Sequence, residues 1–501
     1  MPEGWWAWMV GYAAVLAALH AKWMGAQRRS FWTFPQQKSA WWLAISLASS
    51  SFSISNAGLI SSVIGRYGPD GVFFIWSGML GIGIFPIIFA PVWSRLQFIS
   101  ENEFILMRFR GAWSHRLYRF RSLLLTGVVI PILLAFILVA TRDLLGAFVP
   151  WDPGWALLGL GLALGVVGWN ASLYLKSRVD MLHFVVLMAV VLLALGALVL
   201  DQTSSAPSPK PPSRMLPLEL FVFIGLQWWS AEILDGSGMH AQSLLKQGSK
   251  RIARRGALGG HALTFLLGAA VAIIAVYAQC VAGVRGDDAY LIGWRLLLPE
   301  RAYPLLAIAL FGMGMSTASG FLNWGSGMVA ALLPPATSEA WRQRWGKFVL
   351  VALAAWSTAI AFHMDSLLEG IQLVLAITAG VGPVFILRWF WWRITARVQL
   401  AAMLGVYLCV PLAQITVQAI PPLAPCSFAA ELALATALNS GWWLGVAFVT
   451  NTPDDRQQFQ TFRQACPLHV SKRAVLQVLG IGAVAFSGVL LLRQLLFALQ
   501  P

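Results

Sequence analysis

The stretch WWLAISLASSSFSISNAG, residues 41–58, has the length of a membrane-spanning helix, yet its centre is polar. Five serines lie between positions 49 and 55, and Asn56 follows them. Polar groups without partners are costly in hydrocarbon, and serine hydroxyls compete with the helix for backbone carbonyls. The pattern therefore predicts a helix that breaks within the membrane and exposes carbonyl and hydroxyl oxygens to a small cation. A face of small residues that packs against another helix is the alternative.

A second apolar stretch carries polar residues that could complete such a site. It reads FGMGMSTASGFLNWGSG and covers residues 311–327, with Ser316 and Thr317 side by side. Adjacent hydroxyls and nearby carbonyls suit a hard cation, which prefers oxygen ligands. We therefore expect the two stretches to meet.

The composition indicates an integral membrane protein. Of 501 residues, 58% are hydrophobic and 11% are charged, and the mean hydropathy is +0.71. We find about fourteen apolar stretches near the ~20 residues that a helical span needs. They cover residues 4–24, 40–63, 70–94, 121–142, 153–175, 180–200, 216–240, 257–280, 302–333, 347–363, 367–392, 398–418, 428–450 and 474–498. They are continuous rather than alternating, so we predict an all-α membrane protein and not a β-barrel.

The basic residues follow the topology of these spans. If the chain starts outside, the odd-numbered connections contain 27 of the 35 lysines and arginines. By the positive-inside rule this bias places both termini outside the cytoplasm. The net charge of +15 is then a topology signal with membrane lipid as the partner, and it does not indicate nucleic-acid binding. No pattern typical of an enzyme active site is present, so we expect no catalytic residues.

The seventh span contains a second polar interruption. Gln227, Trp228 and Trp229 precede an acidic, glycine-bearing segment that contains Glu232 and Asp235. We expect a second broken helix here. The two carboxylates could bind a cationic group of a solute or a proton; alternatively, they could cap helix ends or pair with Lys246.

Several of these strings resemble the sodium:solute symporter family. Residues 316–323, STASGFLN, are similar to the sodium-site helix of that family, and residues 41–56 resemble its first broken helix. Residues 227–243 resemble its "QWWA…GGGYxAQR" signature, but Ser237, Met239 and Ser243 depart from it. Residues 387–400 and 451–467 also resemble family strings, so the matches cover about residues 40–470.

The resemblance implies a five-plus-five inverted-repeat fold of the leucine-transporter type. The repeats would be residues 40–200 and 216–397, each opening with a broken helix. Residues 201–215, rich in proline and serine, would link them on the outside. A first transmembrane helix and a cytoplasmic loop would occupy residues 1–39, and further transmembrane helices would occupy residues 398–501.

The resemblance also implies a sodium site and an ion path. The sodium ligands would be the backbone carbonyls of Ser49, Phe52 and Met313 and the hydroxyls of Ser316 and Thr317. Asp180, at the end of the sixth span, would lie on the path by which sodium leaves. A salt bridge from Asp180 to Arg178 is the alternative.

The solute would bind between the two broken helices. The candidate contacts are Asn56, Trp76, Gln227, Trp228, Trp229 and Ser237. Asn56 could instead hydrogen-bond between helices, and Trp228 and Trp229 could be core residues. Sugar-carrying members of the family use a glutamate and an asparagine where Ile75 and Ser237 stand here, which argues against a galactose-type site. The solute itself is not identified.

These expectations combine into a function. The chain is expected to be a sodium-coupled symporter of a small polar organic solute, working by alternating access in a bacterial inner membrane and able to act as a monomer. Two alternatives stay open. One is proton coupling through Asp180, Glu232 or Asp235, and the other is a sensor or assembly subunit that does not transport.

Overall fold

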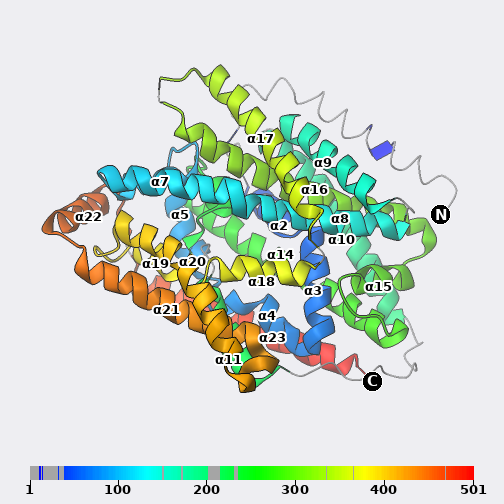
Figure 1. Cartoon of the computed structure of the whole chain (residues 1–501). Coiled ribbons are helices and arrows are strands. Elements are labelled where there is room, and N and C mark those ends of the chain that lie inside the picture. Colours follow the sequence, from blue (N-terminus) through cyan, green and yellow to red (C-terminus); the bar gives the residue numbers. More distant parts are fainter. Residues whose placement is uncertain are drawn as a thin grey trace.

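The computed structural model describes residues 11–12, 14, 32, 39–148, 152–170, 173–200, 215–230, 235–334, 336–364, 366–468 and 470–500. Over these residues the chain is helical, with short 3-10 and π segments and no strands (Figure 1). Each predicted apolar stretch from 40–63 onward coincides with helical segments. Most of the stretch 4–24 lies outside the described residues. The all-α membrane fold predicted from composition is confirmed.

The segment predicted as the first repeat, residues 40–200, opens with a helix that is interrupted after its twelfth residue. Its main helices are α2 (Ala40–Ser51), α3 (Ile54–Tyr67), α4 (Val72–Ile75), α5 (Ala90–Trp93), α6 (Phe104–Arg108), α7 (Ala112–Leu124), α8 (Ile130–Phe148), α9 (Pro153–Asn170) and α10 (Leu173–Leu200). The 3-10 segments η2 (Gly68–Gly71) and η3 (Ser77–Gly81) and the π-helix η4 (Phe85–Phe89) lie between α3 and α5. The 3-10 segment η5 (Glu101–Glu103) precedes α6, and the π-helix η6 (Leu125–Val129) joins α7 to α8.

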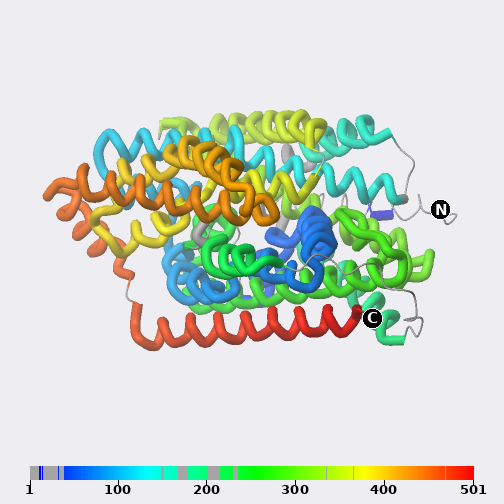
Figure 2. Tube along the Cα trace, turned by 60° about the horizontal axis from the view of Figure 1, so that its bottom comes forward, coloured from blue at the N-terminus to red at the C-terminus, as the bar shows by residue number. Residues whose placement is uncertain are grey.

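The segment predicted as the second repeat, residues 216–397, also opens with an interrupted helix. Its helices are α11 (Pro217–Gly225), α12 (Gln227–Ser230), α13 (Met239–Leu244), α14 (Lys250–Ala282), α15 (Ala289–Leu297), α16 (Tyr303–Leu332), α17 (Glu339–Ala361), α18 (Leu367–Ala376) and α19 (Gly382–Leu387). Four helices follow: α20 (Ala396–Gln418), α21 (Ser427–Val449), α22 (Pro453–Ala465) and α23 (Lys472–Ala498). Figure 2 shows α23 lying along one side of the bundle.

Within the described residues, eight helical stretches are long and apolar enough to cross a membrane. The predicted number of about fourteen is larger partly because most of the stretch 4–24 lies outside the described residues and because residues 54–93 count as one stretch. Short half-helices contribute as well. The half-helices α2, α11 and α18 have 12, 9 and 10 residues, so each is too short to cross a bilayer alone. None of these three half-helices is therefore among the eight stretches.

The serines of the first stretch explain why α2 ends where it does. Ser50 and Ser51 donate their hydroxyls back to the carbonyls of Ser46 and Leu47, both at 2.8 Å. Phe52 and Ser53 are extended, with φ values of −107° and −121°. The new helix α3 then begins with a capping box, in which Asn56 Oδ1 accepts from the Ser53 amide at 2.9 Å. The sequence SSSFSISN therefore ends one helix and starts the next.

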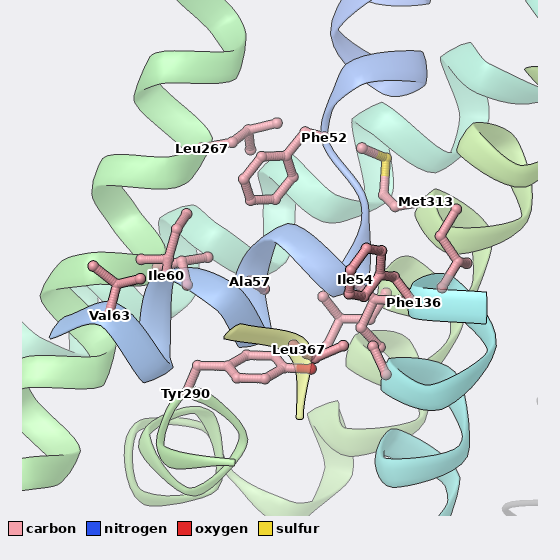
Figure 3. Close-up of a cluster of buried hydrophobic side chains, with 14 of the residues drawn as sticks. Phe52, Ile54, Ala57, Ile60, Val63, Phe136, Leu267, Tyr290, Met313 and Leu367 are labelled. Carbon is pink, nitrogen blue, oxygen red and sulfur yellow. The ribbon is translucent and has the colours of Figure 1, made fainter. Parts of the chain in front are cut away.

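Apolar packing holds this break in place. Figure 3 shows Phe52 beside Leu267 of α14, while Ile54 lies among Phe136 of α8 and Met313 of α16. Phe52 and Ile54 are 3% and 0% exposed. Because Phe52 and Ile54, on the two sides of Ser53, are packed against three helices, the break is a defined structural element.

Small residues let α14 approach α2 closely. A Cβ atom on Gly256 would lie 2.6 Å from Leu43, and one on Gly260 would lie 2.9 Å from Leu47. Close approach at glycines is typical of helix pairs in membranes. The first helix of one repeat is thereby packed against a long helix of the other.

The basic connections gather at one end of the molecule. The start of α7, the end of α19 and helix α22 lie together at that end, while α15 and the C-terminal end of α23 lie at the other (Figure 1). Two contacts join further segments at this end: Arg108 of α6 donates to the carbonyl of Arg388, after α19, at 2.6 Å, and Arg397 of α20 pairs with Asp455 of α22 at 3.0 Å. We call this part of the molecule the basic end.

Candidate functional site

The two polar stretches meet at Thr317. Its hydroxyl, on α16, lies 3.1 Å from the carbonyl oxygen of Ser49 and 3.4 Å from that of Phe52. Both carbonyls lie at the broken end of α2, where the helix no longer supplies amide partners. One hydroxyl proton is thus shared between two backbone oxygens. The structure brings together three of the five residues that we assigned to sodium.

Ser316 and Asp180 form the adjoining part of the site. The Ser316 hydroxyl donates to Asp180 Oδ1, and the Ser46 hydroxyl donates to Asp180 Oδ2 at 3.0 Å. Ser49 also donates its hydroxyl to the Asp180 carbonyl, at 3.3 Å. The Asp180 side chain is 1% exposed. The aspartate that we placed on an ion path therefore contacts the hydroxyls of the candidate site directly.

Sequence reasoning did not single out Ser46. It lies three residues before Ser49, so both residues are on one face of α2, the face turned toward α10 and α16. The three-residue spacing of Ser46 and Ser49 was the sequence signal that could have identified Ser46. The alternative partner of Asp180, the Arg178 side chain, lies outside the described residues.

The ligand atoms available here are all oxygen. Met313, the fifth assigned residue, is 1% exposed and lies one turn before Thr317 on α16. Carbonyls and hydroxyls suit a hard monovalent or divalent cation, and a carboxylate beside them can hold either a cation or a proton. The described residues contain no group of three or more histidine, cysteine, aspartate or glutamate side chains arranged for a metal ion. The oxygen set is therefore the candidate ion site.

Three of the six residues assigned to the solute lie close to one another. Gln227 donates its side-chain amide to the Phe74 carbonyl at 3.2 Å, which joins α12 to α4. Trp228 packs on η3, since a Cβ atom on Gly81 would lie 3.6 Å from its ring. Trp76 lies between α4 and η3 and packs edge-on against Phe265 of α14, with ring centroids 5.3 Å apart. The side chain of Trp229 lies outside the described residues.

The other two, Asn56 and Ser237, have structural partners that the sequence interpretation did not foresee. Asn56 Oδ1 caps α3 by accepting from both the amide and the hydroxyl of Ser53. Ser237 accepts a hydrogen bond from the Arg388 guanidinium. The Ser-x-x-Asn spacing was a readable capping signal for Asn56, whereas nothing local to Ser237 points to Arg388, 151 residues away.

Asp235, a candidate contact for a cationic solute group, forms a buried ion pair with Arg388 instead. Its carboxylate lies 2.7 Å from Arg388 and accepts from the Trp389 indole at 2.7 Å and from the Ser237 amide at 2.9 Å. The side chains of the pair are 0% and 1% exposed. The aspartate thus fastens the second broken helix to α19. Glu232 lies outside the described residues.

A second buried ion pair lies nearby at the basic end. Glu101 and Arg121 are 2.7 Å apart, and each side chain is 1% exposed. The Trp324 indole of α16 donates to Glu101 at 3.2 Å, and Gln242 of α13 accepts from the Glu101 amide at 3.0 Å. The two pairs therefore connect α7, α13, α16 and α19. This arrangement joins four helices at the basic end through buried charges.

At the opposite end, burial and neighbouring carboxylates raise the pKa of Asp287 to about 6. Asp287 lies in the connection between α14 and α15 and accepts from the Leu367 amide, which lowers the pKa, while Asp288 and Asp143 raise it. A pKa raised on folding stabilises the native state below the ordinary value near 3.8, and that stability is lost as pH rises through about 6.

We therefore expect Asp287→Asn to change the pH dependence of thermal unfolding. Between pH 4.5 and pH 7.5 the Tm of wild type should fall relative to that of the variant. Only wild type has the Asp287 carboxylate, whose negative charge is disfavoured in the folded state. Subtracting the Tm of the variant from that of wild type at each pH removes the contribution of the other titrating groups. A difference that is the same at both pH values would contradict the raised pKa.

Comparison with known proteins gives the fold. No protein-family model and no curated protein sequence matches the chain. Among solved structures, a Na⁺-coupled sialic acid symporter in a substrate-bound outward-open state superposes with a TM-score of 0.63 at 15% identity, covering 89% of this chain and 97% of that chain. The fold is a membrane-transporter fold.

A second solved structure supports this conclusion. A transporter of the nucleobase-cation-symport-1 family, in a closed conformation with bromovinylhydantoin bound, gives a TM-score of 0.51 at 12% identity. It covers 90% of this chain and 98% of that chain. Both neighbours are transporters and not enzymes. At these identities the likeness concerns the arrangement of the helices, including the inverted repeats.

Proposed function

We propose that the chain is a cation-coupled secondary transporter that moves a small polar organic solute, with sodium as the coupling ion. The observation that carries the proposal is the Thr317 hydroxyl, which joins the carbonyls of Ser49 and Phe52 at the break. Ser316 beside it is held by the buried Asp180 carboxylate. The resemblance of these residues to the sodium:solute symporters, together with the transporter fold, supports sodium over other cations.

The placement of this site suits alternating access. Ser49 and Phe52 lie in residues 40–200, which we assign to the first repeat, whereas Ser316 and Thr317 lie in residues 216–397, which we assign to the second. A cation held by both sets would fix the distance between the repeats and so favour one arrangement of the broken helix. One sodium ion entering down 100 mV releases ~2.3 kcal/mol, enough for about fifty-fold accumulation of a neutral solute.

We expect sodium to stabilise the purified protein against heat. At about 100 times its dissociation constant, a ligand of the native state adds ~2.7 kcal/mol to the free energy of unfolding. Sodium should therefore raise Tm, whereas potassium at the same ionic strength should not. In the double variant Ser316→Ala/Thr317→Ala the sodium-dependent rise should disappear. A folded wild-type protein whose Tm ignores sodium would remove the main support for sodium coupling.

Asp180 favours a second candidate, proton coupling, because a buried carboxylate between two serine hydroxyls can carry a proton in place of a cation. The variant Asp180→Asn separates the two. Under sodium coupling through the oxygens of Ser49, Phe52 and Thr317, the variant should keep a weakened sodium response. Under proton coupling, solute accumulation in vesicles should follow an imposed pH gradient in wild type and lose that dependence in Asp180→Asn.

The membrane placement is part of the proposal. The basic end would face the cytoplasm of a bacterial inner membrane, as the positive-inside rule requires, and both termini would lie outside. The partners would be the solute and the surrounding lipid.

A further inference from the structure

A cavity of about 260 Å³ lies at the basic end and shares no residue with the candidate ion site. Three helices begin beside it, because Trp113, Thr395 and Thr452 line it and each lies within two residues of the start of α7, α20 or α22. The first amides of a helix have no partner within the helix, and its N-terminus carries a partial positive charge. Three such ends around one cavity favour an anion. We call it the basic-end cavity.

Two of these helix starts are capped by the protein itself, and the third is open. Thr395 Oγ1 accepts from the Val398 amide at 3.4 Å, and Asp455 Oδ2 accepts from the Thr452 amide at 2.8 Å. Helix α7 instead follows Gly111, which has φ +84° and no side chain to cap the helix. A Cβ atom on Gly111 would meet nothing within 4 Å. The start of α7 therefore has room for an acceptor that the protein does not supply.

Arg108 brings a buried positive charge to the same cavity. The residue lines the cavity and is 3% exposed. Its Nε donates to the Arg388 carbonyl at 2.6 Å, and its Nη2 donates to the Ile394 carbonyl at 3.0 Å. The ring centroids of Phe459 and Phe462 lie 4.7 and 5.2 Å from its Cζ atom. These contacts hold the guanidinium in one place, but none of them neutralises its charge.

One donor atom of Arg108, Nη1, remains available. No residue that the structure describes accepts a hydrogen bond from Nη1, and the atom is not enclosed by protein. Burial, together with the neighbouring Arg388, lowers the pKa of Arg108 to about 9, and Asp455 acts in the opposite direction. A buried charge without a counter-charge is costly, and an anion that accepts from Nη1 would reduce that cost.

The charges that line the cavity indicate how much negative charge the ligand carries. Arg108, Arg110 and Arg397 contribute three positive charges, and Asp454 and Asp455 contribute two negative ones. Asp455 is paired with Arg397 at 3.0 Å, and Asp454 is exposed to solvent at the rim. The surplus of one positive charge matches an anion with a single charge, such as a phosphodiester, better than a phosphate monoester with two.

The cavity also lies where two membrane spans end. The span Ala396–Gln418 begins at it, and the span Pro421–Val449 ends three residues before Thr452. Val449 is 84% exposed, and Trp113 is 43% exposed at the cavity itself, which is typical of an aromatic residue at a membrane interface. The ends of spans lie at the level of the lipid headgroups. The phosphodiester is the singly charged anion that phospholipids present at that level.

We propose that the basic-end cavity binds the phosphodiester group of a membrane phospholipid. Arg108 Nη1 and the first amides of α7 donate to the phosphate oxygens, and Arg110 adds positive charge at the rim. At about 260 Å³ the cavity is smaller than the ~300–1,000 Å³ typical of drug-sized ligands, so it suits a headgroup whose acyl chains remain in the bilayer. The bound lipid joins the starts of α7, α20 and α22. This inference is independent of the coupling ion and of the solute.

The test follows the Tm of the full-length protein in dodecyl maltoside, a detergent without phosphate, as dioleoylphosphatidylglycerol is added. Dioleoylglycerol has the same acyl chains without the phosphate, and glycerophosphoglycerol is a soluble phosphodiester. Phosphatidylglycerol should raise Tm at concentrations at which the other two compounds do not.

The variants locate the site. Arg110→Gln should raise the lipid concentration that gives half of the Tm shift about fivefold, and Arg108→Gln should raise it about tenfold or more. The matched control is Arg119→Gln, which removes an exposed arginine of α7 that does not line the cavity; it should change that concentration less than about twofold. Because Arg110 is exposed, its variant decides the test even if Arg108→Gln does not fold.

Four results would overturn the proposal. They are no Tm shift with phosphatidylglycerol, an equal shift with dioleoylglycerol, an equal shift with glycerophosphoglycerol, and equal effects of Arg110→Gln and Arg119→Gln. The second would mean that the acyl chains alone stabilise the protein, and the third that the ligand is a soluble phosphodiester. The fourth would mean that the lipid is attracted by the general positive charge of the basic end.

Discussion

Replacing Asp235 with alanine should destabilise the protein by about 3–5 kcal/mol, the cost typical of breaking a buried ion pair from one side. The substitution would leave the Arg388 guanidinium, 1% exposed, without its carboxylate. It would also remove the acceptor of the Trp389 indole and of the Ser237 amide. Arg388 would keep the Ser237 hydroxyl and the rings of Phe104 and Phe385, which do not neutralise its charge.

Equilibrium unfolding in denaturing detergent and thermal unfolding would both measure this loss. The matched control is Arg397→Ala, which breaks an ion pair to Asp455 whose side chains are 29% and 15% exposed. For partly exposed pairs of this kind we expect about 1 kcal/mol or less. An equal loss of unfolding free energy in the two variants would show that burial does not determine how much the Asp235–Arg388 pair stabilises the protein.

The same ion pair has a consequence for the transport function that we propose. It joins α13 of the second broken helix to α19, and the nearby Glu101–Arg121 pair joins the segment before α6 to α7. Solute release at the basic end would require these helices to separate. The buried charges would then gain water as their direct contacts opened, so the opening is less costly than exposing an apolar interface of the same size.

The first break and its partner could be predicted from the sequence because their signals are local. The SSSFSISN string contains both the back-bonding serines that end α2 and the Ser53–Asn56 cap that starts α3. Ser316 and Thr317 are recognisable by their position inside an apolar stretch. That these two segments meet at Thr317 follows from the repeat architecture, to which the resemblance pointed.

The contacts that could not be predicted are between residues far apart in the chain. We predicted that Ser237 contacts the solute, and that Asp235 binds a cationic group or a proton, caps a helix or pairs with Lys246. Both residues instead contact Arg388, which lies 151 and 153 residues beyond them. An arginine at the end of an apolar stretch is typical of a membrane boundary, so its sequence context favours a lipid-facing role. Only the fold shows that it is buried against the second broken helix.

Gly236→Ala should be the other severely destabilising substitution, with an expected loss of about 2–5 kcal/mol from two separate causes. The glycine has φ +81°, in the region that alanine rarely adopts, and its new Cβ atom would lie 2.1 Å from Cε2 of Phe85. The control Gly283→Ala isolates the first cause. It has φ +69° but no atom within 4 Å of a Cβ, so about 1–2 kcal/mol is expected there.

A double-mutant cycle with Phe85→Ala separates the two causes at Gly236. With the ring removed, Gly236→Ala should cost only the backbone part, comparable to Gly283→Ala, and the coupling free energy should equal the steric part. Thermal unfolding of the four proteins measures it. Additive losses would mean that the Phe85 ring moves aside freely.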